Sequence, residues 1–180
     1  MTVEPEKLLD RQVIYEGRVV KRLSIDTVEL PGGRVSTREV IKHPGAVCMV
    51  PVDPDGNFLL VWQYRHASEK ALLEVPAGKL DGDEPLEEAV QRELREEVGH
   101  RAERIDRLCG FYVAPGYCDE YITAYLARDL VHDPLQADYD EDIEVERVPP
   151  DRAVAMILNG EIEDAKSISS ILTAIRFLRS

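Results

Sequence analysis

Two glutamates at the apolar edge of one predicted helix constrain this chain more than any other feature of its sequence. Residues 78–100, GKLDGDEPLEEAVQRELREEVGH, carry apolar side chains at helical spacing, with Leu86 and Leu94 on one stripe. Glu93 and Glu97 fall at the edge of that stripe, one helical turn apart. Carboxylates at i and i+4 repel each other and weaken a helix slightly. Either this edge is exposed to water, or the two glutamates share something positive.

The two explanations differ in whether the carboxylates are buried. In water such a pair costs only a few tenths of a kcal/mol, so energy alone does not exclude an exposed edge. Partly buried at a separation of about 6 Å, the pair would repel by roughly 3 kcal/mol at an effective dielectric constant near 20. A divalent cation would turn that repulsion into attraction, and carboxylate oxygens are the ligands that Mg²⁺ prefers. A buried edge therefore predicts a metal site.

Length and composition indicate one folded domain. The chain has 180 residues, 44% of them hydrophobic, which is enough for a sizeable core. A formal net charge of −13 argues against binding to a nucleic-acid backbone. We see no apolar run near the roughly 18 residues of a membrane helix and no secretory signal, so we expect a cytoplasmic protein without a membrane partner. The three cysteines show no CxxC spacing, which indicates neither a disulfide framework nor a zinc site.

Segments rich in β-branched residues alternate with turn signals through the first half of the chain. The predicted strands are residues 11–17, 19–30, 34–42, 45–53, 58–65 and 71–78. Asp55–Gly56 lies between two apolar runs and predicts a hairpin that joins residues 45–53 to residues 58–65.

The second half mixes helices with strands. The acidic helix follows Asp83, which can cap it, has Pro85 in its first turn and ends at Gly99. Further strands are predicted at residues 104–116, 120–130 and 143–148, and helices at residues 149–160 and 164–179. Many strands, one central helix and helices at the end predict an α/β fold with a mixed sheet.

The acidic segment resembles the signature of the Nudix hydrolase family. It has Gly78, Glu84 after five residues, Arg92-Glu93-Leu94 after seven more, then Glu96-Glu97 and Gly99. Every fixed position of that signature is matched. His100 departs from the family, which usually has an aliphatic residue there, and this puts the local packing at the helix end in doubt more than the chemistry.

The resemblance implies a fold and a metal site. The fold would be a Nudix-type α/β/α sandwich at residues 44–180, with an N-terminal β extension at residues 1–43 in the interface of a homodimer. Mg²⁺, or alternatively Mn²⁺, would be the cofactor. The implied metal ligands are Glu93, Glu97, Glu96 and the backbone carbonyl of Ala77. Arg92 would pair with an acid of the signature, Glu84 would order the loop, and Gly78 and Gly99 would be structural.

Residues outside the signature resemble the ADP-ribose pyrophosphatase branch of this family. Pro115 stands sixteen residues after Gly99 in YVAPGYCDE, although a plain Pro-Gly turn is the alternative. The Q-x-R and E-x-P-A-G elements in residues 62–84 point the same way. The implied substrate is a nucleoside diphosphate sugar, ADP-ribose, cut to AMP and ribose 5-phosphate. The implied substrate-binding residues are Arg65, which would bind phosphate, Arg38, which would reach the nucleotide of the partner subunit, and Val19, Pro115 and Gly116. Plain sheet packing is the alternative for Val19.

The general base is expected in a loop before the last strand. Glu141 in DYDEDIEV matches the family glutamate best, and Asp140 and Asp142 stand one residue away. An acidic solvated loop is the alternative, in which case the catalytic acid–base group would belong to the helix, at Glu96. Rival functions are the same chemistry on another sugar nucleotide such as GDP-mannose, a non-catalytic Nudix-fold regulator, and an acidic scaffold without metal.

Overall fold

The computed structural model describes residues 3–136 and 142–179 and contains two compact units. Unit 1 comprises Met1–Gly45 and Tyr112–Tyr121. Unit 2 comprises Ala46–Phe111 and Ile122–Ser180.

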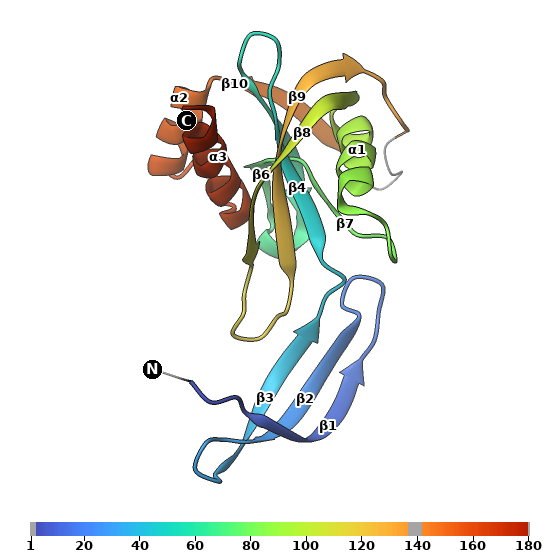
Figure 1. Ribbon diagram of the computed structural model, residues 1–180, viewed down its shortest axis with the longest axis vertical. Helices are drawn as coiled ribbons and strands as arrows, with labels where there is room; N and C mark the ends of the chain where they lie inside the picture. The colour runs from blue at the N-terminus through green and yellow to red at the C-terminus, as the bar shows by residue number, and fades with distance from the viewer. Residues whose placement is uncertain (1–2, 137–141, 180) are drawn as a thin grey trace. The chain divides into compact units, whose positions relative to one another are not determined.

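Unit 1 contains an antiparallel sheet of three strands in the order β1-β2-β3 (Figure 1). The strands are β1 (Lys7–Tyr15), β2 (Arg22–Glu29) and β3 (Val35–Lys42). Alternate residues of the central strand, Ser24, Asp26 and Val28, are buried, as expected for a strand with one covered face. Every residue of β1 is exposed.

Unit 2 contains two sheets. One has the order β7-β4-β9-β8, made of β4 (Ala46–Pro51), β7 (Ala77–Lys79), β8 (His100–Tyr112) and β9 (Tyr121–His132). The other has the order β10-β5-β6, made of β5 (Phe58–Arg65), β6 (Lys70–Glu74) and β10 (Ile143–Val148). The first sheet is mixed, because β4 runs parallel to β9 and antiparallel to β7.

Helices lie on both sides of the sheets of unit 2. Figure 1 shows α1 (Leu86–Glu97) on one side, and α2 (Pro150–Leu158) with α3 (Ala165–Leu178) on the other. Strand β4 faces both layers: Val47 and Met49 pack with α1, while Cys48 and Val50 pack with α2 and α3. This is the predicted α/β sandwich. No helix within the described ranges is both long and apolar enough to span a bilayer.

The predicted hairpin at Asp55–Gly56 is wrong. Strands β4 and β5 belong to different sheets, and an isolated bridge joins Val52, which follows β4, to Phe58. The turn itself forms, with Gly56 at a φ of 84°, but it carries the chain from one sheet to the other. The predicted strand 71–78 is likewise split, because β6 ends before Pro76 and β7 pairs in the other sheet.

Two smaller predictions about element ends are also wrong. Asp83 does not cap α1; the capping position is Pro85, and no side chain accepts a hydrogen bond there. Val19 is not in a strand, because β2 begins at Arg22. Gly99 does follow the helix end, with a φ of 72°, a left-handed conformation that glycine adopts at little cost.

Candidate active site

The two glutamates at the apolar edge of α1 are buried. Glu93 and Glu97 are each 7% exposed, whereas Glu87 and Glu88 on the outer face of α1 are exposed. The fully solvated edge is therefore excluded for this pair. The energetic argument for a nearby positive partner applies instead, because buried carboxylates need compensation.

Strand β7 passes so close to α1 that it contacts both carboxylates. A Cβ atom added to Gly78 would lie 1.6 Å from Oε1 of Glu93, so only glycine leaves room for that carboxylate. One residue earlier, the backbone N–H of Ala77 donates a hydrogen bond of 3.1 Å to Oε2 of Glu97. The Pro-Ala-Gly turn and the helix thus form one structural unit.

Arg92 connects three of the signature glutamates. Its Nε and Nη2 donate to the two oxygens of Glu84 at 3.1 and 3.0 Å. Its Nη1 donates to Oε1 of Glu93 at 2.6 Å and to Oε2 of Glu96 at 3.1 Å. The hydrogen bonds with Glu84 are the main cause that raises the pKa of Arg92, and the same pairing lowers the pKa of Glu84. Arg92 therefore favours the charged form of Glu84 and holds the three carboxylates close together.

The donor set fits a hard divalent cation. Glu93, Glu96 and Glu97 supply carboxylate oxygens along one side of α1. No cysteine lies in residues 78–100, and the one histidine there, His100, contacts the carbonyl of Val98 beyond the helix end. Within residues 3–136 and 142–179, however, no three acidic, histidine or cysteine side chains gather in a geometry ready to hold a metal. The side chain of Arg92 lies against Glu93 and Glu96.

Arg65 lies at the end of β5, in the same unit as α1. Its Nε and Nη2 donate to the two oxygens of Glu74 at 3.0 and 2.8 Å. The hydrogen bonds with Glu74 raise the pKa of Arg65, and the charge of Glu97 contributes in the same direction. The Arg65 guanidinium is therefore within electrostatic reach of the helix carboxylates.

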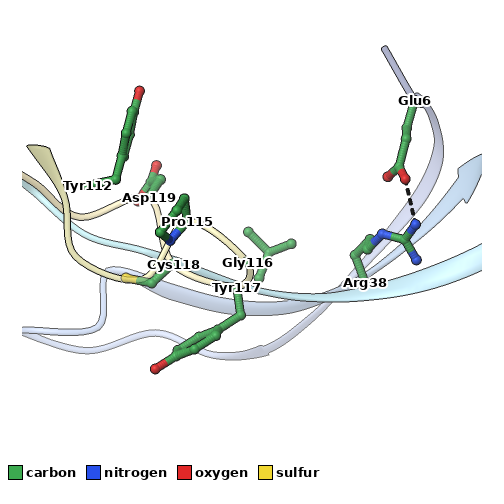
Figure 2. Close-up of a pocket in the computed structure, with 9 residues that line it drawn as sticks. Glu6, Arg38, Tyr112, Pro115, Gly116, Tyr117, Cys118 and Asp119 are labelled. Carbon is green, nitrogen blue, oxygen red and sulfur yellow. Dashed lines mark hydrogen bonds and ion pairs between the residues drawn. The ribbon is translucent and has the colours of Figure 1, made fainter. Parts of the chain in front are cut away.

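A separate hollow of about 410 Å³ lies within unit 1 (Figure 2). Its lining includes three residues predicted to bind substrate, Arg38, Pro115 and Gly116. Arg38 forms an ion pair with Glu6 on one side, and the 115–119 loop lies on the other. The Pro-Gly segment is also a turn, because Ala114 accepts hydrogen bonds from the N–H groups of Tyr117 and Cys118. The two interpretations of Pro115 are thus compatible.

Two tyrosines of this hollow were missed by sequence reasoning. Tyr112 and Tyr117 line it and are 57% and 56% exposed. Tyrosine is common in strands and turns, so neither residue type nor spacing marks these two as functional. Val19 is not part of the lining, and Glu141 lies outside the described residues.

Two polar side chains of α1 contact neighbouring segments of the chain. Gln91 exchanges two hydrogen bonds with the backbone of Ala102. Arg95 donates to the backbone oxygen of Asp133 at 3.1 Å. His100, the exception to the signature, contacts the carbonyl of Val98 and the ring of His132, so its polar ring is accommodated at the helix end.

Residues 42–171 match the NUDIX domain family. The chain belongs to the Nudix family. An ADP-ribose pyrophosphatase of Bacillus subtilis (strain 168) is 37% identical over 168 residues, covering 92% of this chain and 90% of the relative. An ADP-ribose pyrophosphatase of Mycobacterium tuberculosis (strain ATCC 25618 / H37Rv) is 41% identical over 167 residues, covering 91% and 80%.

Other relatives carry a different substrate in their names. A GDP-mannose pyrophosphatase of Yersinia enterocolitica serotype O:8 is 37% identical over 180 residues, covering 93% of each chain. Among solved structures, an ADP compounds hydrolase superposes with a TM-score of 0.89 at 23% identity, covering 99% of this chain and 97% of that one. At that identity the likeness shows the shared Nudix fold.

Proposed function

We propose that this Nudix protein hydrolyses the pyrophosphate bond of ADP-ribose, giving AMP and ribose 5-phosphate. The observation that carries the proposal is the burial of Glu93 and Glu97, at 7% exposure each, against the backbone of Ala77 and Gly78. An intact, buried acidic signature is what a pyrophosphatase requires. The two ADP-ribose pyrophosphatases among the relatives support the choice of substrate.

Glu93, Glu97, Glu96 and the carbonyl of Ala77 would hold Mg²⁺, or alternatively Mn²⁺. When bound, the metal would neutralise the pyrophosphate and lower the pKa of an attacking water. Arg92 would orient Glu93 and Glu96 through its present hydrogen bonds, and Glu84 would fix Arg92 in turn. Gly78 provides the space for the Glu93 carboxylate, and Gly99 ends the helix that carries all three acids.

The remaining substrate contacts are assigned by resemblance together with exposure. Arg65, whose side chain is 39% exposed beside Glu74, would bind the pyrophosphate. In unit 1, Arg38 would reach the nucleotide of the partner subunit, Pro115 and Gly116, which line the same hollow, would contact substrate, and Val19 would lie near the adenine. Glu141 would be the general base, with Glu96 as the alternative.

The sequence identity of one relative supports GDP-mannose as a second candidate substrate. The GDP-mannose pyrophosphatase relative is as similar in identity as one of the ADP-ribose enzymes, so the same chemistry on GDP-mannose is the alternative function. A non-catalytic regulator is less well supported, because Glu93, Glu96, Glu97 and Arg92 are all present and packed together.

The proposal is tested by turnover of ADP-ribose, ADP-glucose and GDP-mannose, each with Mg²⁺ and with EDTA. We expect ADP-ribose to have the highest kcat/KM, with AMP as product and no turnover in EDTA. Glu97→Gln should lower Mg²⁺-dependent turnover by about a hundredfold or more, whereas Glu88→Gln, on the exposed face of the same helix, should not lower it. Preference for GDP-mannose would instead establish the alternative, and no turnover of any of the three would contradict both.

We also propose that the protein is a homodimer formed through its N-terminal extension, residues 1–43. Strand β1 supports this, because its apolar residues Leu8, Leu9, Val13 and Ile14 are 47–50% exposed on a sheet edge. An uncovered apolar edge strand invites pairing with another chain.

A further inference from the structure

Glu74 is the most deeply buried acidic residue near the candidate site, and it has no role in the assignments above. It ends β6 with 2% of its surface exposed. It pairs with two cations: Arg65 from β5, and Lys166 from the first turn of α3. Glu74 and Lys166 are largely buried, with 2% and 12% of their side chains exposed, whereas the Arg65 side chain is 39% exposed. Burying a charged pair is costly unless it is fully paired, and such pairs often add little to stability. This cluster therefore calls for a functional explanation.

The geometry of the Arg65–Glu74 pair leaves one end of the guanidinium for a second acceptor. Glu74 is bound along the edge formed by Nε and Nη2, with two parallel hydrogen bonds of 3.0 and 2.8 Å. A guanidinium has five N–H donors in a rigid plane, so a carboxylate on that edge fixes the plane and leaves the Nη1–Nη2 end able to donate. A phosphate is the acceptor whose geometry matches such a fork.

Helix α3 holds the other side of Glu74. Lys166 contacts the Oε2 atom of Glu74 and also lies 2.8 Å from Asp164, which caps the helix by accepting the N–H of Ser167 at 2.9 Å. The hydroxyl oxygen of Ser167 in turn accepts the N–H of Val75 at 2.8 Å. Glu74 and Val75 are therefore both bound to the start of α3. These contacts hold the Glu74 carboxylate in place when the Arg65 side chain moves.

The same short segment leads directly to the acidic signature. After Val75, the carbonyl of Pro76 accepts a hydrogen bond of 3.0 Å from Met49, and Ala77 donates to Glu97. Through hydrogen bonds and ion pairs, residues 74–77 thus link α3 to strand β4 and then to α1. Arg65 is thus oriented by a carboxylate that is itself rigidly connected to the helix carrying Glu97.

We propose that Glu74 is a positioning residue, which aims the free end of Arg65 at the pyrophosphate of the substrate, and that Lys166 holds Glu74 for this task. The inference rests on the proposed function, because it takes the substrate to be a nucleoside diphosphate sugar. The purely structural alternative is that Glu74 only joins β6 to α3.

A double-mutant cycle separates the two roles. Glu74→Gln keeps the size of the side chain but removes the charge and one of the two acceptors. If Glu74 acts through Arg65, this change should lower kcat/KM for ADP-ribose about tenfold or more, but less than about twofold in an Arg65→Ala background, since coupled residues are non-additive. The same fold loss in both backgrounds, or no loss in either, would overturn the proposal.

Glu163→Gln is the matched control. Glu163 pairs with Lys70, so this second ion pair also links β6 to the start of α3, but both side chains are about half exposed. Its removal should leave kcat/KM unchanged. A loss equal to that of Glu74→Gln would show that any weakened link between β6 and α3 reduces activity, and the positioning role would fall.

Two further measurements do not depend on turnover. Calorimetric titration with ADP-ribose in EDTA should show weaker binding for Glu74→Gln by the same factor in Kd, and no added effect in the Arg65→Ala background. In wild type, the ¹⁵N-resolved Nε–H signal of Arg65, assigned from its loss in Arg65→Lys, should be protected from solvent exchange. Fast exchange of that proton would overturn the proposal even if Glu74→Gln failed to fold.

Failure of the proposed function gives a different result. If wild type hydrolysed GDP-mannose but not ADP-ribose, the choice of substrate would be wrong, and the cycle would be measured on GDP-mannose with the same expectations. If wild type hydrolysed its substrate well and the cycle were additive, only the role of Glu74 would be wrong.

Discussion

The carboxylate of Glu93 occupies the space in which a side chain on Gly78 would begin. A Cβ atom at residue 78 would lie 1.6 Å from Oε1 and 1.8 Å from Cδ of Glu93. The backbone of Gly78 is not in the left-handed region, so alanine suits its conformation. The conflict is therefore with a functional side chain and not with the fold.

Gly78→Ala should separate activity from stability. The end of the Glu93 side chain can swing away, so the fold should survive, and loss of chain entropy in the unfolded state even offsets part of any cost. The displaced carboxylate should weaken Mg²⁺ activation and lower turnover by about a hundredfold, the range of losing a key electrostatic group. Thermal unfolding and a Mg²⁺ titration of activity test this.

Gly56→Ala should lower stability and leave activity unchanged, the reverse of Gly78→Ala. Gly56 has a φ of 84° with open space around the missing Cβ, so alanine there is strained without touching any neighbour. We expect a lower melting temperature with normal kcat and Mg²⁺ dependence. If Gly78→Ala also lost stability and kept its activity, the close approach of Gly78 to Glu93 would have no catalytic meaning.

Glu97→Gln should cut turnover by about a hundredfold or more at saturating Mg²⁺. The fold should persist, because the amide oxygen of glutamine can still accept the N–H of Ala77, and removal of a buried charge relieves repulsion with Glu93. Steady-state kinetics across Mg²⁺ concentrations, with circular dichroism, are the measurements. Near-normal turnover of Glu97→Gln would show that the metal assignment is wrong.

The sequence carried much of the site because its geometry is local. Spacing along one helix predicts that Glu93 and Glu97 lie together, which needs no long-range pairing. The signature predicts Gly78 as a structural residue, although the pairing of β7 with β4 helps to hold it beside the helix. The prediction of a hairpin at Gly56 is wrong for the opposite reason. The turn itself is a local feature, but the sheet that each flanking strand joins depends on a partner far along the chain, β9 for β4 and β10 for β5. Glu74 was missed because its partners Arg65 and Lys166 are 9 and 92 residues away in sequence.

Acid should reveal the link between Glu84 and Arg92. Hydrogen bonds from Arg92 lower the pKa of Glu84 from its ordinary 4.5. A carboxylate whose pKa is lower in the folded state stabilises the fold fully above the unfolded pKa, and this contribution is lost as pH falls toward the folded value. Glu84→Gln should therefore be less stable than wild type at pH 7, with a smaller difference at pH 3.5.

Urea unfolding at the two pH values measures that difference. Glu88→Gln, which removes an exposed carboxylate from the helix that carries Arg92, is the control and should differ little from wild type in stability. An equal difference between wild type and Glu84→Gln at both values would mean that Glu84 stabilises the loop by some means other than its charge.

The exposed strand β1 should be the contact between subunits. Val13→Glu combined with Ile14→Glu places charges on both faces of that strand, where apolar side chains are now about half exposed. Light scattering should give a dimer mass for wild type and a monomer mass for the variant, because buried unpaired charges are costly. Wild type at monomer mass that still bound ADP-ribose tightly would remove both the dimer and the nucleotide contact proposed for Arg38.

The general base should be separable from the metal ligands by kinetics. A carboxylate that activates water need not bind metal, so Glu141→Gln should lower kcat by about 10²- to 10⁴-fold and leave KM and the Mg²⁺ requirement almost unchanged. Glu93→Gln should also shift the Mg²⁺ dependence. Glu96 is the rival base; it lies on the same helix as the other proposed ligands and accepts a hydrogen bond from Arg92.

The turnover of Glu141→Gln and Glu96→Gln, measured side by side, shows which glutamate is the general base. Asp142→Asn, one residue from Glu141, serves as the control for a general effect of charge in that segment. If Glu141→Gln ran at wild-type speed while Glu96→Gln were inactive with its metal affinity intact, the base would belong to the helix. In that case Arg92 would orient a proton acceptor as well as a metal ligand, since its Nη1 contacts Glu96 and Glu93 at once. Arg92→Lys, which loses that fork, should then lower kcat even at saturating Mg²⁺.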